Sequence, residues 1–201
     1  DVESIDADVK TLVVVHPKSL SEKTLLALDQ FVLRGGRLVA LVDPFSLVDL
    51  RTTMEQNPMA MQMGGGAEPS TLGPLFDAWG VGFDTTKVVA DLAAATKLND
   101  GRGGVEENPA FLSLGPDNLS RADLLTSPLS QVMLPFAGAL EARKTEGVVF
   151  TPLITTSEAD ACLVDACEAA GVPHQVFVGR NDVPCGSTIG PLTSALSLIH
   201  I

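Results

Sequence analysis

Cysteine is absent from the first 161 residues of this 201-residue chain, and its three cysteines lie in the last 40 residues, at Cys162, Cys167 and Cys185. An odd number of cysteines at these spacings fits neither a zinc site nor a closed disulfide framework. We interpret them as buried or free thiols. Their uneven distribution indicates that the two ends of the chain have different origins.

Basic charge and long apolar runs are also scarce. Lys and Arg number 13 against 25 Asp and Glu, which gives a formal net charge of −12. Such a surface repels phosphate backbones and anionic lipid head groups, so nucleic acid is not an expected partner. No apolar run approaches the roughly 18 residues that span a bilayer, and no signal peptide is visible. We expect this chain to be soluble and not to insert into a membrane by itself.

What is present is a hydrophobic content of 45%, typical of a globular domain, and a strand–helix–strand pattern at the start. Residues 11–15 and 38–42 are short apolar runs, which predict strands buried on both faces. Between them, apolar residues recur at helical spacing. Ser19 is the predicted N-cap with Glu22 at the third helical position, and Gly35-Gly36 is predicted to end the helix. This βαβ unit favours an α/β fold with a largely parallel sheet and flanking helices.

The rest of the chain shows weaker patterns. Residues 51–70 have no period and predict a mobile loop, while apolar residues on one face predict a helix over 71–79. The capping pattern at 120–123 predicts a further short helix. Further strands are predicted over residues 87–90, 110–114, 131–134 and 147–154.

Most of residues 5–156 resembles one known family. The runs that carry the resemblance are 8–22 (DVKTLVVVHPKSLSE), 29–38 (DQFVLRGGRL), 42–44 (VDP), 78–81 (AWGV), 83–84 (FD), 87–91 (KVVAD) and 150–153 (FTPL). In this order they are similar to the auxiliary component of gliding-motility-type ABC transport systems.

The resemblance implies a three-layer fold of the amidotransferase-like or flavodoxin-like kind. It also implies a domain on the extracytoplasmic (periplasmic) face of the inner membrane, with the membrane subunits of an ABC transporter as partners. Amidotransferase-like enzymes carry a cysteine nucleophile after a strand, but the first cysteine here is residue 162. A serine elbow is missing as well. We therefore predict a non-catalytic auxiliary domain without a cofactor.

Two polar residues follow the predicted parallel strands. His16 and Asp43 stand where the strands end, at the edge of an open α/β sheet where ligands usually bind. They are candidates for a ligand or partner site, which would make the chain a small-ligand-binding α/β module. The favoured interpretation is that each residue closes a strand ahead of a proline.

The C-terminal part has a different resemblance. Residues about 160–194, and above all 180–191 (RNDVPCGSTIGP), resemble a fragment of the aspartyl aminopeptidase family of zinc peptidases. In that family the loop lies near the substrate pocket, which implies a substrate-loop role for Asn181, Asp182, Gly186, Ser187 and Thr188. The family's metal ligands and catalytic carboxylate have no counterparts here. We predict an inactive fragment that binds no metal.

These resemblances divide the chain at residues 156–157. We expect residues 1–156 to form the transporter auxiliary domain and residues 157–201 to be an incomplete peptidase-like segment. Residues 196–201 resemble a translated sequencing-library adapter, so the whole chain is interpreted as a chimera. A piece of about 44 residues falls below the usual size of a self-sufficient domain. We therefore expect it to pack poorly on the first domain or to borrow a sheet edge.

Overall fold

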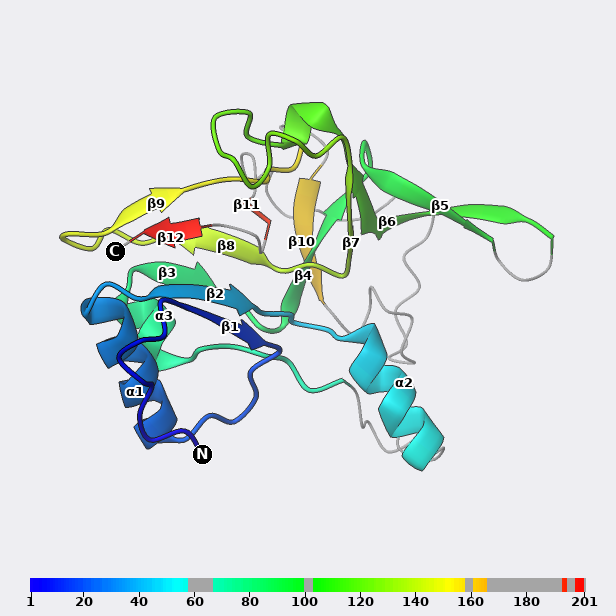
Figure 1. Cartoon of the computed structure of the whole chain (residues 1–201). Coiled ribbons are helices and arrows are strands. Elements are labelled where there is room, and N and C mark those ends of the chain that lie inside the picture. The colour runs from blue at the N-terminus through cyan, green and yellow to red at the C-terminus, as the bar shows by residue number, and fades with distance from the viewer. Residues whose placement is uncertain (58–66, 100–102, 158–160, 166–192, 195–197, 201) are drawn as a thin grey trace.

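The chain is described by a computed structural model for residues 1–57, 67–99, 103–157, 161–165, 193–194 and 198–200. Figure 1 shows how the elements follow one another. In chain order they are β1 (Thr11–Val15), α1 (Glu22–Leu33), β2 (Arg37–Leu41), α2 (Leu47–Gln56), α3 (Pro74–Ala78), β3 (Val81–Phe83), β4 (Lys87–Asp91), β5 (Ala95–Asn99), β6 (Val105–Leu114), η2 (Pro116–Asn118), β7 (Val132–Pro135), β8 (Ala139–Ala142), β9 (Val149–Thr151), β10 (Ala161–Asp165), β11 (Thr193–Ser194) and β12 (Leu198–His200).

The predicted βαβ unit is confirmed. β1 and β2 pair in parallel from Thr11 opposite Arg37 to Val15 opposite Leu41, and α1 connects them. The predicted cap is wrong by two residues: Ser21, not Ser19, is the N-cap, and its hydroxyl accepts a hydrogen bond from the backbone N–H of Thr24. Ser19 has a φ of 47° and lies outside the helix. The helix gives way to Gly35, as predicted, with the positive φ of 89° that glycine tolerates.

Only one face of the β1–β2 pair is covered, so the prediction of strands buried on both faces is wrong. Leu12 and Val14 lie on the inner face and pack against the buried cluster that includes Leu28 of α1. On the outer face Val13 is 57% exposed and Val15 is 66% exposed. Figure 1 shows α1 on one side of this strand pair. The apolar runs predicted the strands correctly, but no second layer of described residues buries their other side.

The largely parallel, three-layer sheet predicted from the βαβ unit is not found in the described residues. Apart from β1–β2, every described strand pair is antiparallel: β3–β8, β4–β10, β5–β6, β6–β7, β8–β11 and β9–β12. The physical reason lies in the connections. A parallel pair needs a crossover of a dozen or more residues, usually an α-helix. The described residues after 83 contain no α-helix that could serve as one, and joins such as residues 92–94 and 136–138 are too short for any crossover. The fold is mixed α/β with small sheets.

Three further predictions change. Residues 51–56 belong to α2 rather than to a loop, while 58–66 lie outside the described residues. The helix predicted over 71–79 is confirmed in part, since α3 is Pro74–Ala78. Residues 120–130 form turns and not a helix. The predicted strands over 87–90, 110–114, 131–134 and 147–154 correspond to β4, β6, β7 and β9, while β3, β5, β8 and β10 were not predicted.

The buried side chains form three neighbouring clusters. One lies under β1 and β2 and includes Phe76 and Trp79. A second lies around β6 and includes Leu112 and Ala161, so β10 contributes to the core. The third joins Phe45 to Phe136, whose rings meet edge to face with centroids 5.4 Å apart. The antiparallel pairing of β10 with β4 fits the expectation that the C-terminal segment borrows a sheet edge.

Candidate functional site

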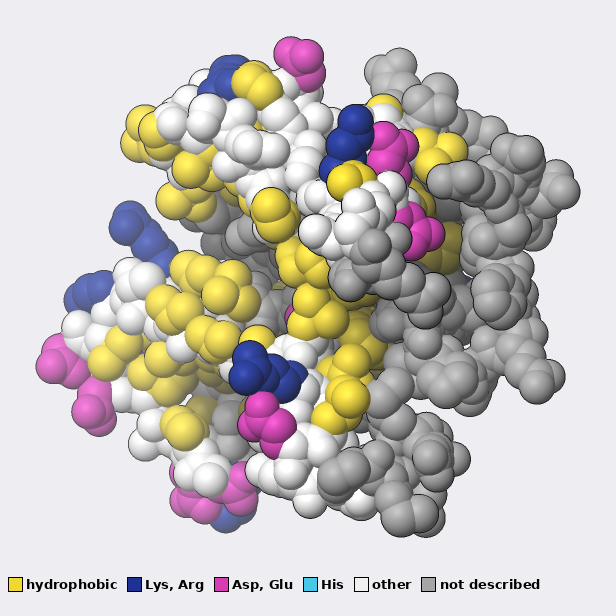
Figure 2. All heavy atoms as spheres, turned by 90° about the vertical axis from the view of Figure 1, so that its right-hand side faces the viewer, with side chains coloured by type: hydrophobic (Ala, Val, Ile, Leu, Met, Phe, Trp, Pro, Cys, Tyr) yellow, Lys and Arg dark blue, Asp and Glu magenta, His cyan; other side chains and the backbone are white. Residues whose placement is uncertain are grey.

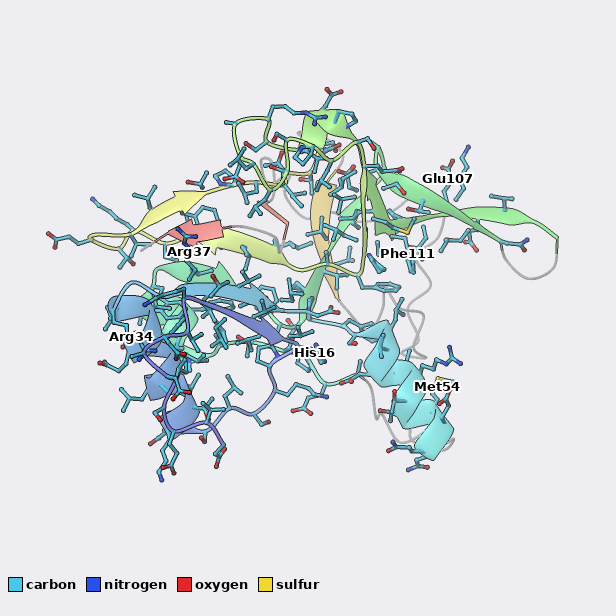
Figure 3. All side chains as sticks on the ribbon, viewed as in Figure 1. His16, Arg34, Arg37, Met54, Glu107 and Phe111 are labelled. Atoms are coloured by element: carbon cyan, nitrogen blue, oxygen red, sulfur yellow. The ribbon has the colours of Figure 1, made fainter. Side chains whose placement is uncertain are left out.

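His16 comes directly after β1, at the carboxyl ends of the two parallel strands. Its backbone N–H donates to the carbonyl oxygen of Leu41 at 2.9 Å, which continues the ladder one residue beyond the strand. Its φ of 49° lies in the left-handed region, which non-glycine residues rarely adopt. Figure 3 shows His16 between the end of β1 and α2. The turn aims the imidazole toward the start of α2 instead of along the sheet.

Asp49 is the partner of His16, and it joins two cations. Nε2 of His16 lies 3.2 Å from Oδ2 of Asp49, and Nζ of Lys18 donates to the same oxygen at 2.5 Å. The hydrogen bond from Lys18, followed by that from His16, holds the pKa of the Asp49 carboxyl below its ordinary value. The hydrogen bond between Lys18 and Asp49 also raises the pKa of the Lys18 amine. All three side chains are partly exposed, so the cluster lies at the surface.

The first turn of α2 explains the position of Asp49. Ser46 is the N-cap, and its hydroxyl accepts from the backbone N–H of Asp49, the third helical residue, at 3.2 Å. An acidic side chain is favourable here because the helix N-terminus carries a partial positive charge. The sequence reading missed Lys18 and Asp49. The pattern Ser46-Leu47-Val48-Asp49 is the signal that indicates a helix start.

Asp43 lies beside this cluster on the end of β2. Its Oδ1 accepts from the backbone N–H of Phe45 at 2.9 Å. Burial raises the pKa of Asp43 from 3.8 to about 6. Two smaller effects oppose that rise: the hydrogen bond from the backbone of Phe45 and the electrostatic attraction of His16. This carboxyl therefore takes up a proton close to neutral pH, unlike an ordinary aspartate.

Ser70, which is fully buried, ties a distant segment to the same strand end. Its hydroxyl accepts from the backbone N–H of Asp43 at 2.7 Å, and its own N–H donates to the carbonyl oxygen of Asp43 at 2.8 Å. Next to it, the N–H of Thr71 donates to the carbonyl of Pro17 at 3.0 Å. These bonds fasten residues 70–71 across the ends of both parallel strands.

The structure thus places the two candidate residues on neighbouring strand ends, as the βαβ pattern predicts. It does not join them by a hydrogen bond: His16 bonds to Asp49, while Asp43 bonds to Phe45 and Ser70. The candidate peptidase-like residues Asn181, Asp182, Gly186, Ser187 and Thr188 lie outside the described residues.

The chemistry open to this cluster is limited. Within the described ranges, no three His, Cys, Asp or Glu side chains come together as a metal site would require. The hydroxyl of Ser19 donates to Glu68 at 3.2 Å, and that of Ser70 is taken up by the backbone of Asp43. The ionisable side chains of this cluster can bind and release protons. Its hydrogen bonds also connect the ends of β1 and β2 to the start of α2 and to residues 70–71.

Comparison with known proteins gives two separate results for the chain. Matches to curated proteins are short: 51% identity over 41 residues with a probable M18 family aminopeptidase 2 of Streptomyces avermitilis, and 53% over 32 residues with an aspartyl aminopeptidase of Dictyostelium discoideum. They cover 20% and 16% of this chain and only 10% and 7% of those proteins. The chain therefore spans about a tenth of the length of these relatives. They support the resemblance to a peptidase fragment.

No solved structure matches the chain significantly. Among the residues that the structure describes, no helix has the length and apolar character to cross a membrane. A family model described as "ABC-type uncharacterized transport system" matches residues 1–175, most of the chain. This chain therefore belongs to the auxiliary protein family of the ABC-type uncharacterized transport systems.

Proposed function

We propose that this chain is a non-catalytic interaction domain that serves an ABC-type transport system of the gliding-motility type from the periplasmic side of the inner membrane. The observation that carries the proposal is the family match over residues 1–175. The runs quoted for the gliding-motility resemblance support the subtype and the location. The proposed partners are the membrane subunits of the transporter.

The arrangement at the strand ends supports a non-catalytic role. The polar side chains there are bonded to one another or to the backbone: His16 and Lys18 to Asp49, and Ser70 to Asp43. A nucleophile activated by a base needs a free hydroxyl or thiol within hydrogen-bond reach of that base. In this cluster the described hydroxyl that bonds to a carboxylate is that of Ser19, which donates to Glu68 at 3.2 Å on the exposed surface.

Co-purification tests the proposal. The chain would be expressed with the membrane-spanning and ATP-hydrolysing subunits of its proposed ABC transport system, and the complex would be isolated in detergent. We expect the chain to remain with these subunits at a fixed stoichiometry, while an unrelated ABC transporter retains none. A chain that separates from its own transporter as readily as from the unrelated one would overturn the proposal.

A second candidate function rests on the short aminopeptidase matches. Under this alternative, Asn181, Asp182, Gly186, Ser187 and Thr188 derive from a substrate loop, and we propose that the fragment is inactive and binds no metal. The test is release of acidic N-terminal residues from peptides with and without added Zn²⁺, together with the zinc content of the purified chain. Zinc near one per chain, or zinc-dependent release, would contradict inactivity.

A third candidate is a small-ligand module at the ends of β1 and β2, supported by the location of His16 and Asp43. Thermal unfolding against a panel of sugars and small anions tests it. A ligand present at 100 times its dissociation constant stabilises the folded state by about 2.7 kcal/mol. A flat response across the panel would leave the interaction role as the better account.

We also propose that residues 1–156 are the functional domain and 157–201 an added segment. Limited proteolysis tests this division: a stable fragment ending near residue 156 would support it. Protection that continues through Asp165 would argue for a longer domain, because β10 pairs with β4.

A further inference from the structure

Residues 119–130, which we name the Leu124 loop, hold two adjacent leucines in solvent. Leu124 is 89% exposed and Leu125 is 58% exposed. Figure 1 shows the loop at the end of the molecule opposite α1 and α2. Figure 2 shows hydrophobic side chains on the surface of this upper part of the molecule. Surface loops normally carry polar residues at their tips, so two neighbouring exposed leucines need a physical reason.

The loop is braced from within by its own charged side chains. The guanidinium of Arg121 donates to the carbonyl oxygens of Ser127 at 2.8 Å and Leu129 at 3.0 Å. The Asp123 carboxylate accepts from the N–H of Leu125 at 2.8 Å, and the Asp123 carbonyl accepts from Ser127 at 2.8 Å. Both charged groups are engaged in shaping the loop, which leaves the tip apolar.

The base of the loop is anchored in the core. The hydroxyl of Thr126, a buried residue, donates to the carbonyl of Ser120 at 2.7 Å. The N–H of Ser120 donates to the carbonyl of Leu153 at 2.8 Å, and Leu119 forms a bridge with Ile154. A braced and anchored loop has already lost much of its conformational entropy. Binding through it therefore incurs a smaller ordering cost than binding through a flexible loop.

Charge and composition favour a protein partner for this tip over a lipid surface. Helices and loops that bind lipid surfaces add interfacial Trp or Tyr, or free Lys and Arg, to their leucines. The Leu124 loop has no Trp or Tyr, and Arg121, its one cation, is bonded to the loop backbone. The net charge of −12 also opposes an anionic bilayer and a second copy of the chain.

We infer that the Leu124 loop is the docking element of the domain, and that Leu124 and Leu125 enter an apolar recess on the extracytoplasmic side of a membrane subunit of the transporter. The inference rests on the proposed function, because it assumes that the chain binds an ABC transport system. It assigns that binding to one loop and to hydrophobic burial of two side chains.

The test compares two double variants in the detergent-solubilised complex with the proposed ABC transporter. Leu124→Gln with Leu125→Gln is the test variant. Leu26→Gln with Leu33→Gln is the control, since both of those leucines are similarly exposed, on α1. We expect the dissociation constant to rise at least about tenfold for the test pair and less than about twofold for the control. Equal urea midpoints for the two variants would show that folding is intact.

A third variant tests whether the shape of the loop matters for binding. Arg121→Lys keeps the charge but loses the planar guanidinium that holds two carbonyl oxygens, so we expect it to weaken binding several-fold with both leucines present.

Unchanged affinity of the Leu124 and Leu125 variant would overturn the docking inference and leave the proposed function standing. An unaltered chain that binds no transporter would overturn both. Binding to vesicles of neutral lipid, or self-association, that disappears in the leucine variant would replace the protein partner with lipid or with a second copy.

Discussion

The carboxylate of Asp91, at the end of β4, holds Ser157 by two bonds across 66 residues of sequence. Oδ2 accepts from the backbone N–H of Ser157 and Oδ1 accepts from its hydroxyl, each at 2.8 Å. Oδ1 also accepts from the N–H groups of Ala93 and Ala94. Asp91 has no exposed surface, so these four donors take the place of the hydrogen bonds that its carboxylate would make with water.

We expect Asp91→Asn to lower the free energy of unfolding by about 2 kcal/mol, because an amide NH₂ would replace an accepting oxygen and face a backbone donor. Urea unfolding followed by circular dichroism measures the change. Asp117→Asn, on the surface of η2, is the matched control and should change stability by no more than about 0.5 kcal/mol. Equal stability of the Asp91 variant and the wild type would show that the tether to Ser157 contributes little.

The raised pKa of Asp43 predicts a pH dependence of stability. Below about pH 4 this group is protonated in both states, whereas between 3.8 and about 6 the unfolded chain loses the proton and the folded chain keeps it. Stability therefore falls as pH rises through this window, by at most about 2 kcal/mol for a partly buried group. The lowered pKa of Asp49 acts in the opposite direction: its stabilisation is present above pH 3.8 and is lost at lower pH.

Asp43→Asn isolates the first effect, since the amide oxygen can still accept from Phe45. We expect the variant to gain stability relative to wild type at about pH 7 and to lose this advantage at about pH 3.5, below the ordinary pKa of 3.8. Urea unfolding of both proteins at the two pH values gives the comparison. A constant difference between them would mean that Asp43 does not titrate in this range.

The polar strand ends are expected to be dispensable for partner binding. His16→Ala combined with Asp43→Ala should leave co-purification with the transporter unchanged, because the docking inference places the contact at the Leu124 loop. A stability loss of about 1 kcal/mol is expected, since the His16–Asp49 pair is partly exposed. Lost transporter binding at unchanged folding would identify these strand ends as part of the binding site.

Gly80 tests close packing between α3 and the segment after β8. Its φ is +71°, and an added Cβ would lie 2.2 Å from Oγ1 of Thr145 and 2.7 Å from the carbonyl oxygen of Arg143. We expect Gly80→Ala to cost about 2 kcal/mol or more, measured by urea unfolding. Gly35→Ala is the control for backbone strain alone, because its φ is +89° but nothing lies within 4 Å, and about 1 kcal/mol is expected. Equal losses would show that Thr145 moves aside freely.

Sequence patterns predicted only part of the candidate site, because they place residues along the chain and not against distant segments. His16 and Asp43 follow apolar runs, and a βαβ unit places such residues on one edge. Asp49 became their neighbour because α2 begins at Leu47, which the looser composition of residues 51–70 obscured. The Leu124 loop shows the limit of local rules. Ser120 to Asp123 has the composition of a helix start, but Arg121 and Thr126 bond to carbonyls within the loop and hold turns instead.

The sequence by itself determined the elements whose signals are local: β1 and β2 from apolar β-branched runs, α1 from its periodic apolar face, and the turn at Gly35. Tertiary structure alone decided that the strands after residue 80 pair antiparallel, that one face of β1 and β2 stays open, and that His16 bonds to Asp49 rather than to Asp43. The physical reason is the distance along the sequence over which each kind of interaction acts. A residue's own neighbours set its backbone preference and its cap, whereas the pairing of a strand and the covering of its faces depend on side chains tens of residues away.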